Sequence, residues 1–329
     1  MKKVIISLLI LLTCAIPMQA QYDLLSAKKG VIKGGYDFWV YTPEDYYFSQ
    51  ESTALIIFLH GASLCGRNLN RVLRYGSIDA VKMGLDIPAL IVAPQNPGGP
   101  WNPHKLNDIL TWMEKHYAYN KSRVYVLGMS LGGYGTLDFA GTYPEKIAAA
   151  IALCGGSTLK DYRKLGELPL WIAHGTADRA VSVKESQKVV EGMQRLGITS
   201  RLRFDWLKGA SHGALARYFY SKKTYEWLFR HTLDDPWRPV DTTIDITRDD
   251  LSHVYQEFKR RTDQLEIELN SRDVEPEDDS DDAAAGRIEL IGIGEDRGDL
   301  RLHEREVRRQ FERVLHQKAV RGAVRLHAL

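Results

Sequence analysis

Three residues of this chain have the types and the order that nucleophilic attack on a carbonyl carbon requires. Ser130 lies in the pentapeptide GMSLG, Asp178 ends the run HGTAD, and His212 lies in the run GASHG. A serine hydroxyl is a poor nucleophile until a base takes its proton, and that base needs an acid to fix its tautomer and offset its charge. We therefore predict Ser130 as the nucleophile, His212 as the base and Asp178 as the acid, because this is the chain order expected when the serine lies between a strand and a helix of an α/β fold.

The residues around Ser130 predict a tight turn between a strand and a helix. The pattern G-x-S-x-G is a weak signal by itself and gains meaning only in that setting. Residues 124–127 read VYVL and predict a strand, and residues 134–143 predict a helix. Gly128 and Gly132 remove side chains that would collide across the turn, which leaves the Ser130 hydroxyl exposed.

Apolar runs and helix-like segments alternate over about two hundred residues, which predicts a fold of the α/β class. Antiparallel edge strands are predicted within residues 31–41, and buried strands at residues 53–59, 88–93, 124–127, 147–153, 169–173 and 201–207. Helices are predicted at residues 106–117, 182–196 and 214–229, the second with Ser182 as N-cap and Glu185 completing a capping box. The result is a mostly parallel sheet with helices on both faces, whose ligands bind beyond the carboxyl ends of the strands.

We choose the acid by its position relative to the predicted strands. Asp178 directly follows the predicted strand 169–173, so it lies at the same edge of the sheet as Ser130. Asp205 falls within a strand, Glu185 within a helix, and Asp161 comes one strand too early.

The choice of base rests on the same reasoning. His212 lies in the loop after the last strand, where the chain order places the base. His116 and His231 are in or near helices, while His60 and His174 precede glycine at strand ends, where a structural hydrogen bond is the usual role.

Two backbone amides are predicted to bind the oxyanion of the tetrahedral intermediate. One belongs to Leu131, the residue after the nucleophile, and the other to Ala62 in the loop that His60 opens. Trp101, in the Pro- and Gly-rich loop 94–101, is predicted as a substrate-binding surface for a sugar or an aromatic acyl group.

The two ends of the chain differ from its middle. Residues 1–20 have a basic start, an apolar run and a small-residue end, which predicts a signal peptide cleaved after Ala20 and a secreted or periplasmic protein. A lipid anchor at Cys14 is the less favoured alternative, because Thr13 departs from the usual lipoprotein box. Residues 234–329 are predicted as a charged C-terminal extension, partly helical and partly disordered, after a catalytic domain at 21–233.

The composition of the chain argues against nucleic acid and membranes as partners. The 329 residues are 44% hydrophobic, enough for a buried core, and carry a formal net charge of +2. This charge gives no broad field for nucleic acid, and no segment of the mature chain predicts a membrane span. Export permits a disulfide between Cys65 and Cys154, but two free thiols are favoured.

Residues 30–232 resemble the α/β-hydrolase superfamily, and within it the lid-less bacterial esterases grouped with dienelactone hydrolases, phospholipase/carboxylesterases and feruloyl or acetylxylan esterases. The segments that carry the resemblance are FLHGAS, APQNPGGPW, RVYVLGMSLGGYGTLDFA, WIAHGTAD and GASHG. The chain departs from relatives in residues 64–67, LCGR, where acidic or glycine-rich residues are common. The connection 155–168 is short where lipases commonly insert a lid, which implies an open cleft with no large lid.

The sequence therefore predicts a secreted serine hydrolase that cleaves carboxylic esters through an acyl-enzyme, with no metal and no organic cofactor. The resemblance and the export signal imply acetyl or feruloyl esters of plant polysaccharides as substrates. Two alternatives stay open. One is a serine peptidase of the prolyl-oligopeptidase type, although the chain has no room for the usual propeller, and the other is a non-catalytic carbohydrate-binding module on a hydrolase fold.

Overall fold

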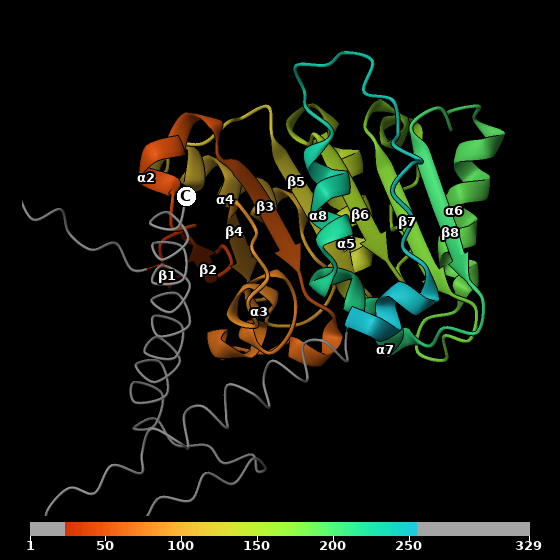
Figure 1. Cartoon of the computed structure of the whole chain (residues 1–329), viewed down its shortest axis with the longest axis horizontal. Helices are drawn as coiled ribbons and strands as arrows, with labels where there is room; N and C mark the ends of the chain where they lie inside the picture. The colour runs from red at the N-terminus through yellow and green to blue at the C-terminus, as the bar shows by residue number, and fades with distance from the viewer. Residues whose placement is uncertain (1–23, 255–329) are drawn as a thin grey trace, which may run out of the picture.

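The computed structural model describes residues 24–254, and in this part of the chain eight strands form one sheet in the order β1-β2-β4-β3-β5-β6-β7-β8 (Figure 1). The strands are β1 Leu25–Lys28, β2 Phe38–Tyr41, β3 Ala54–Leu59, β4 Ala89–Pro94, β5 Val124–Met129, β6 Ala149–Leu153, β7 Leu170–Gly175 and β8 Leu202–Leu207. Strands β3 to β8 pair in parallel, while β1 and β2 add an antiparallel edge. The predicted mostly parallel sheet is confirmed.

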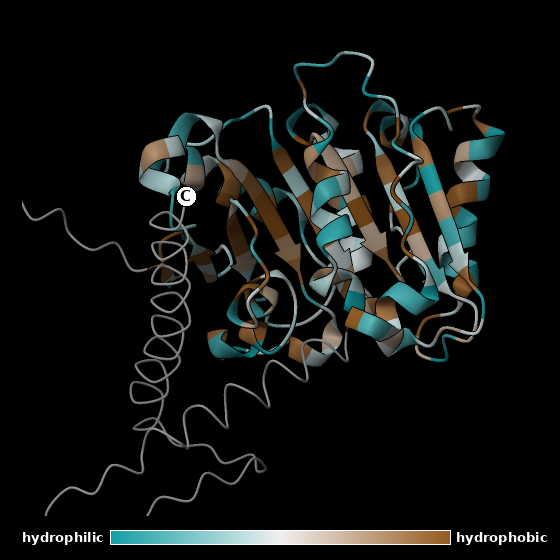
Figure 2. Ribbon diagram, in the orientation of Figure 1, coloured by the Kyte–Doolittle hydropathy of each residue, from teal (hydrophilic) through white to brown (hydrophobic). Residues whose placement is uncertain are grey.

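The central strands are buried on both faces, which is why they read as continuous apolar runs. Side chains alternate between the faces with a period of two. Tyr125 and Leu127 of β5 join the core cluster on one face, and Val124 and Val126 join the cluster on the other. Figure 2 shows the consequence, with brown strands inside and teal residues along the outer sides of the helices.

Helices cover both faces of this sheet. The first cluster packs beneath α3 Ser77–Lys82, α7 His212–Leu215 and α8 Lys222–Phe229, and the second packs beneath α4 Pro103–His116, α5 Leu131–Thr142 and α6 Val183–Arg195. A short helix, α2 Tyr46–Ser49, precedes β3. None of the helices within residues 24–254 is long and apolar enough to cross a bilayer.

The ends of two helices follow local chemistry. Pro103 occupies the first turn of α4, and the Asn102 side chain accepts hydrogen bonds from the amides of His104 and Lys105. Ser182 caps α6 as predicted. The expected reciprocal bond from Glu185 is replaced, because its carboxylate binds the Tyr134 hydroxyl and the Lys188 ammonium group.

Two predicted elements have different bounds. The first strands lie at β1 and β2, and the residues between them turn at Gly30 and Gly34, whose φ angles are +65° and +70°. The predicted closing helix 214–229 is divided into α7, a 3-10 helix at Ala216–Tyr220 and α8. The Thr224 hydroxyl and the Tyr225 hydroxyl turn back to the carbonyls of Tyr218 and Phe219, and these bonds stabilise the break.

The C-terminal boundary of the folded domain lies beyond residue 233, so the predicted division at that point is wrong. Ile244, Ile246 and Leu251 are 8%, 3% and 2% exposed and belong to the core cluster beneath α8. Arg203, which is largely buried, donates to the Ile244 carbonyl and pairs with Asp245. Composition hid these contacts because three apolar residues are sparse among charged neighbours. The prediction for residues 255–329 lies outside the described residues.

This packing predicts that residues 234–254 stabilise the domain. A chain ending at Leu233 should unfold at a lower temperature than the full chain, with a free energy of unfolding lower by about 5 kcal/mol, because three buried apolar side chains are lost. A chain ending at Val254 keeps every contact described above and is the matched control. Thermal and urea denaturation would measure both, and equal stability of the two truncations would contradict the expected role of the segment.

Candidate active site

Ser130 occupies a strained turn between β5 and α5. Its φ and ψ angles are 60° and −121°, and a positive φ is unfavourable for a residue with a side chain. Such strain costs about 1–3 kcal/mol and persists only where the surroundings hold it. Here the Ser130 amide donates to the Leu153 carbonyl at 2.8 Å, and the Ser130 carbonyl accepts from the Tyr134 amide at 3.1 Å.

The glycines of the turn have a steric reason. A Cβ atom on Gly132 would lie 1.9 Å from the carbonyl oxygen of Leu59 in β3, and one on Gly128 would lie 2.4 Å from the Gly132 carbonyl oxygen. Helix α5 thus begins in backbone contact with the neighbouring strand, as the sequence pattern predicts.

Asp178 and His212 form a short hydrogen bond. His212 Nδ1 donates to Asp178 Oδ2 at 2.6 Å. Asp178 lies in the loop after β7, and His212 is the first residue of α7. The carboxylate is fully buried, while 24% of the His212 side chain is exposed and accessible to a substrate. This geometry fixes the proton on Nδ1 and leaves Nε2 as the basic nitrogen.

The other oxygen of Asp178 binds the backbone of its own loop. Asp178 Oδ1 accepts from the amides of Ala180 at 2.8 Å and Val181 at 2.9 Å. Burial alone would raise the pKa of Asp178, but the hydrogen bonds from His212 and the two amides outweigh it and hold the pKa below its usual value. The acid therefore stays ionised at neutral pH.

Ser130, Asp178 and His212 follow the carboxyl ends of β5, β7 and β8, so the fold gathers them at one edge of the sheet. Within residues 24–254 no hydrogen bond joins Ser130 to His212. Contacts of this kind commonly tighten only when substrate is present.

The predicted oxyanion loop lies next to Ser130. A Cβ atom on Gly61 would be 3.3 Å from Ser130 Cβ, and neither the Ala62 nor the Leu131 amide has an acceptor among the described residues. The loop is held from behind, because the Tyr75 hydroxyl accepts from the Gly61 amide at 2.6 Å. Both predicted donors are thus free to bind a ligand oxygen.

His60 has a structural role, as the sequence predicts. Its Nε2 accepts from the Asn96 amide at 3.0 Å, so its proton is on Nδ1, which donates to the Gly61 carbonyl at 2.7 Å. Burial lowers the pKa of His60 to about 4, and the ring is neutral at physiological pH.

Trp101 is a packing residue, and its predicted role in substrate binding is wrong. The side chain is 3% exposed, its indole donates to the His60 carbonyl at 3.3 Å, and its ring packs edge-on against His60 and Tyr36. Gly135 of α5 leaves the space that the indole fills. Trp101 supports the oxyanion loop from the interior.

Sequence reasoning missed Tyr75 and the contact of His174 with Asp178. Tyr75 gives no signal, because it lies in an Arg-rich segment without clear periodicity. His174 lies with its Nε2 at 3.2 Å from Asp178 Oδ2, so the acid has a second histidine neighbour. The spacing of four residues in HGTAD was the available signal.

One group of side chains has the residue types of a metal site. Cys154, His174 and Asp178 each place a ligand-type atom within 4.8 Å of the others. Burial and the Asp178 charge raise the pKa of Cys154, which keeps a proton on the thiol, and the Asp178 oxygens already accept hydrogen bonds. This donor set therefore suits a hydrogen-bonded cluster of a neutral thiol, an imidazole and a carboxylate better than a metal ion. Cys65 and Cys154 are both free thiols, as favoured from the sequence.

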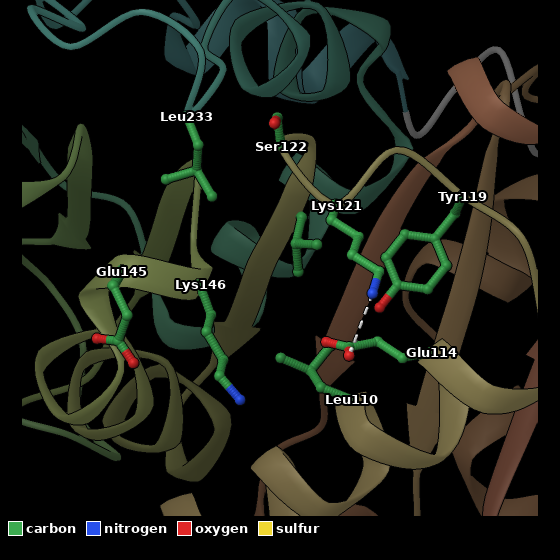
Figure 3. Close-up of a pocket in the computed structure, with 9 residues that line it drawn as sticks. Leu110, Glu114, Tyr119, Lys121, Ser122, Glu145, Lys146 and Leu233 are labelled. Atoms are coloured by element: carbon green, nitrogen blue, oxygen red, sulfur yellow. Dashed lines mark hydrogen bonds and ion pairs between the residues drawn. The ribbon is translucent and has the colours of Figure 1, made fainter.

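A pocket lies at the opposite end of the sheet. Figure 3 shows Glu114 and Leu110 of α4 facing Lys121 and Lys146, with the ion pair between Lys121 and Glu114 at 3.4 Å. Val124 at the amino end of β5 also lines it, whereas Ser130 follows the carboxyl end of that strand. The pocket is therefore separate from the candidate active site.

The connection between β6 and β7 is short. It contains only one regular element, the 3-10 helix Arg163–Glu167, and its start is fixed where Ser157 and Thr158 donate to the buried carboxylate of Asp138. No lid is inserted there, in agreement with the sequence prediction.

The sheet order, the turn at Ser130 and the helices on both faces define an α/β-hydrolase fold. Residues 103–226 match the dienelactone hydrolase family. The chain resembles acetylxylan esterase A of Emericella nidulans, with 25% identity over 154 residues, 46% of this chain and 50% of that protein. It resembles acetylxylan esterase A of Aspergillus awamori with 27% identity over 142 residues, 43% of this chain and 45% of that protein. The chain thus spans about half the length of the curated relatives it matches.

A solved structure supports the fold. The crystal structure of a thermostable esterase superposes with a TM-score of 0.53 at 24% identity, covering 64% of each chain. The likeness at this identity concerns the arrangement of the backbone.

Proposed function

We propose that this chain is a serine esterase that cleaves carboxylic esters through an acyl-enzyme. The observation that carries the proposal is the 2.6 Å bond between His212 and the buried Asp178, at the same sheet edge as the strained Ser130 turn. The similarity to acetylxylan esterases supports esters as the substrate class.

The proposed reaction has two halves. Ser130 Oγ attacks the ester carbonyl carbon and its proton passes to His212 Nε2, while the amides of Leu131 and Ala62 bind the oxyanion. The C–O bond to the alcohol breaks and the alcohol takes the proton from His212. Water then attacks the acyl-enzyme with His212 as base, and the carboxylic acid and free Ser130 are released.

The substrate that we favour is an acetyl or feruloyl ester of a plant polysaccharide. The similarity to acetylxylan esterases supports an acetylated xylan as the substrate. The short β6–β7 connection leaves room for a large polymer at the site. Export to the periplasm or the exterior, where such polymers occur, stays a prediction, because residues 1–20 lie outside the described residues.

A fluorophosphonate probe tests the proposal. We expect stoichiometric labelling of the peptide that contains Ser130, detected by mass spectrometry, and weaker labelling in His212→Ala, because the base is lost. Acetyl, butyryl and feruloyl esters would be assayed beside matched amides. Absence of both labelling and ester hydrolysis would contradict the proposal, and faster amide than ester hydrolysis would favour a peptidase. Binding of xylan without labelling would favour a non-catalytic module.

A further inference from the structure

His174 lies in the interior behind the proposed triad. Its side chain is fully buried at the carboxyl end of β7, four residues before Asp178. Its Nε2 is 3.0 Å from the Val181 carbonyl oxygen and 3.2 Å from Asp178 Oδ2. Since both neighbours only accept hydrogen bonds, Nε2 must carry a proton and donate it.

The other side of the His174 ring is fixed to a helix. Nδ1 lies 2.7 Å from the Ser186 hydroxyl of α6, and that hydroxyl lies 2.5 Å from the Gly155 carbonyl oxygen beyond β6. The ring is therefore attached to a rigid helix on one side and to the loop of the acid on the other. A side chain held in this way transmits the position of the scaffold to the group that it contacts.

Asp178 accepts hydrogen bonds on both oxygens. Two backbone amides reach Oδ1, while Oδ2 accepts from His212 Nδ1 and faces His174 Nε2. The backbone bonds come from the loop after β7, which also carries Asp178 itself. His174 at the end of β7 and the Cys154 thiol just after β6 are the side chains that join this carboxylate to the sheet.

We propose that His174 is a positioning residue, which holds the Asp178 carboxylate and the Val181 carbonyl so that Oδ2 faces His212. The inference rests on the proposed function, in which Asp178 orients the base. Without the Nε2 donor, Oδ2 would lose a partner and the carboxylate could rotate about its side-chain bonds.

Two other titratable groups lie close to His174. The Cys154 thiol, just after β6, lies in the same cluster and stays protonated because burial raises its pKa, so it donates to Asp178 as well, but a thiol is a weaker donor than an imidazole N–H. Glu185 of α6 binds Tyr134 and Lys188 instead. Burial lowers the pKa of His174 itself, although the Val181 carbonyl and Asp178 oppose that effect.

Two amide variants separate positioning from simple packing. In His174→Gln the side-chain amide reaches the place of Nε2 and can donate to Asp178, whereas in His174→Asn it reaches only the place of Nδ1. The two variants share their chemistry and differ by one methylene group. His174→Leu removes both ring nitrogens and keeps an apolar side chain of moderate size.

We expect kcat for an acetyl ester to fall by about 10- to 100-fold in His174→Asn and His174→Leu with KM nearly unchanged, and to recover to within about fivefold of wild type in His174→Gln. Circular dichroism would show that the variants are folded. Equal activity of the Gln and Asn variants, or unfolding of both, would overturn the proposal, because a restored donor should restore the site.

A spectroscopic readout keeps this test independent of esterase activity. The proton in the 2.6 Å bond between His212 and Asp178 should give a downfield NMR resonance in wild type. The resonance should be displaced or lost by exchange in the Asn and Leu variants and return in the Gln variant. If wild type hydrolyses no ester but this pattern holds, the proposed function fails while the role of His174 stands. An unchanged resonance in all three variants would refute that role.

Discussion

Ser130→Ala is expected to lower kcat/KM for p-nitrophenyl acetate by about 10⁴- to 10⁶-fold, because the nucleophile and its base act as a unit. The turn that holds residue 130 is fixed by main-chain bonds to Leu153 and Tyr134, so alanine should adopt the same conformation. Stability measured by thermal denaturation should therefore stay close to wild type while activity is lost.

The structure offers a matched control and a second variant for this experiment. Ser52 is an exposed serine whose hydroxyl donates to the Ser49 carbonyl before β3, far along the chain from the turn, and Ser52→Ala should leave hydrolysis unchanged. Ser130→Gly should be inactive but more stable than Ser130→Ala by about 1 kcal/mol, because glycine adopts a φ of 60° without strain. Activity of Ser130→Ala within tenfold of wild type would disprove the nucleophile assignment.

Gly132→Ala is expected to destabilise the fold by about 4 kcal/mol or more, or to prevent soluble expression. The added Cβ would lie 1.9 Å from the Leu59 carbonyl oxygen and 2.5 Å from the Leu59 carbonyl carbon. Both contacts are with backbone atoms of β3, which pairs with β4 and β5 in the middle of the sheet. No rotamer change can relieve them, so the start of α5 or the strand must move.

Gly213→Ala is the control for this prediction. Gly213 also lies in a helix, α7, but a Cβ atom there would meet no atom within 4 Å. We expect a change in the free energy of unfolding of less than about 1 kcal/mol, because only helix propensity changes. Urea denaturation would compare the two variants, and similar midpoints would show that the sheet accommodates the added methyl group.

Ser130 and Gly132 belong to one structural feature, the strained turn between β5 and α5. The chain holds a non-glycine residue in an unfavourable backbone conformation, and glycines on either side let a helix and a strand approach closely enough to hold it. The proposed nucleophile is thereby presented before any substrate arrives, so its orientation is already fixed in the folded chain.

The sequence by itself determined the features that neighbours along the chain encode. Continuous apolar runs located β3 to β7, because a strand buried on both faces must be apolar at every position. The G-x-S-x-G turn and the order of Ser130, Asp178 and His212 could be predicted in the same way, since turn chemistry and strand ends are local properties.

Only the tertiary structure decided which distant segments meet. In the sequence Trp101 lies in a loop, but in the fold its indole packs against Gly135 of α5. The composition of residues 234–254 is that of a solvated extension, but Ile244, Ile246 and Leu251 pack in the core. His174 gains its contact with Asp178 only through the bend of the loop after β7. Burial and hydrogen bonding are fixed by long-range packing, which the pattern of neighbouring residues does not specify.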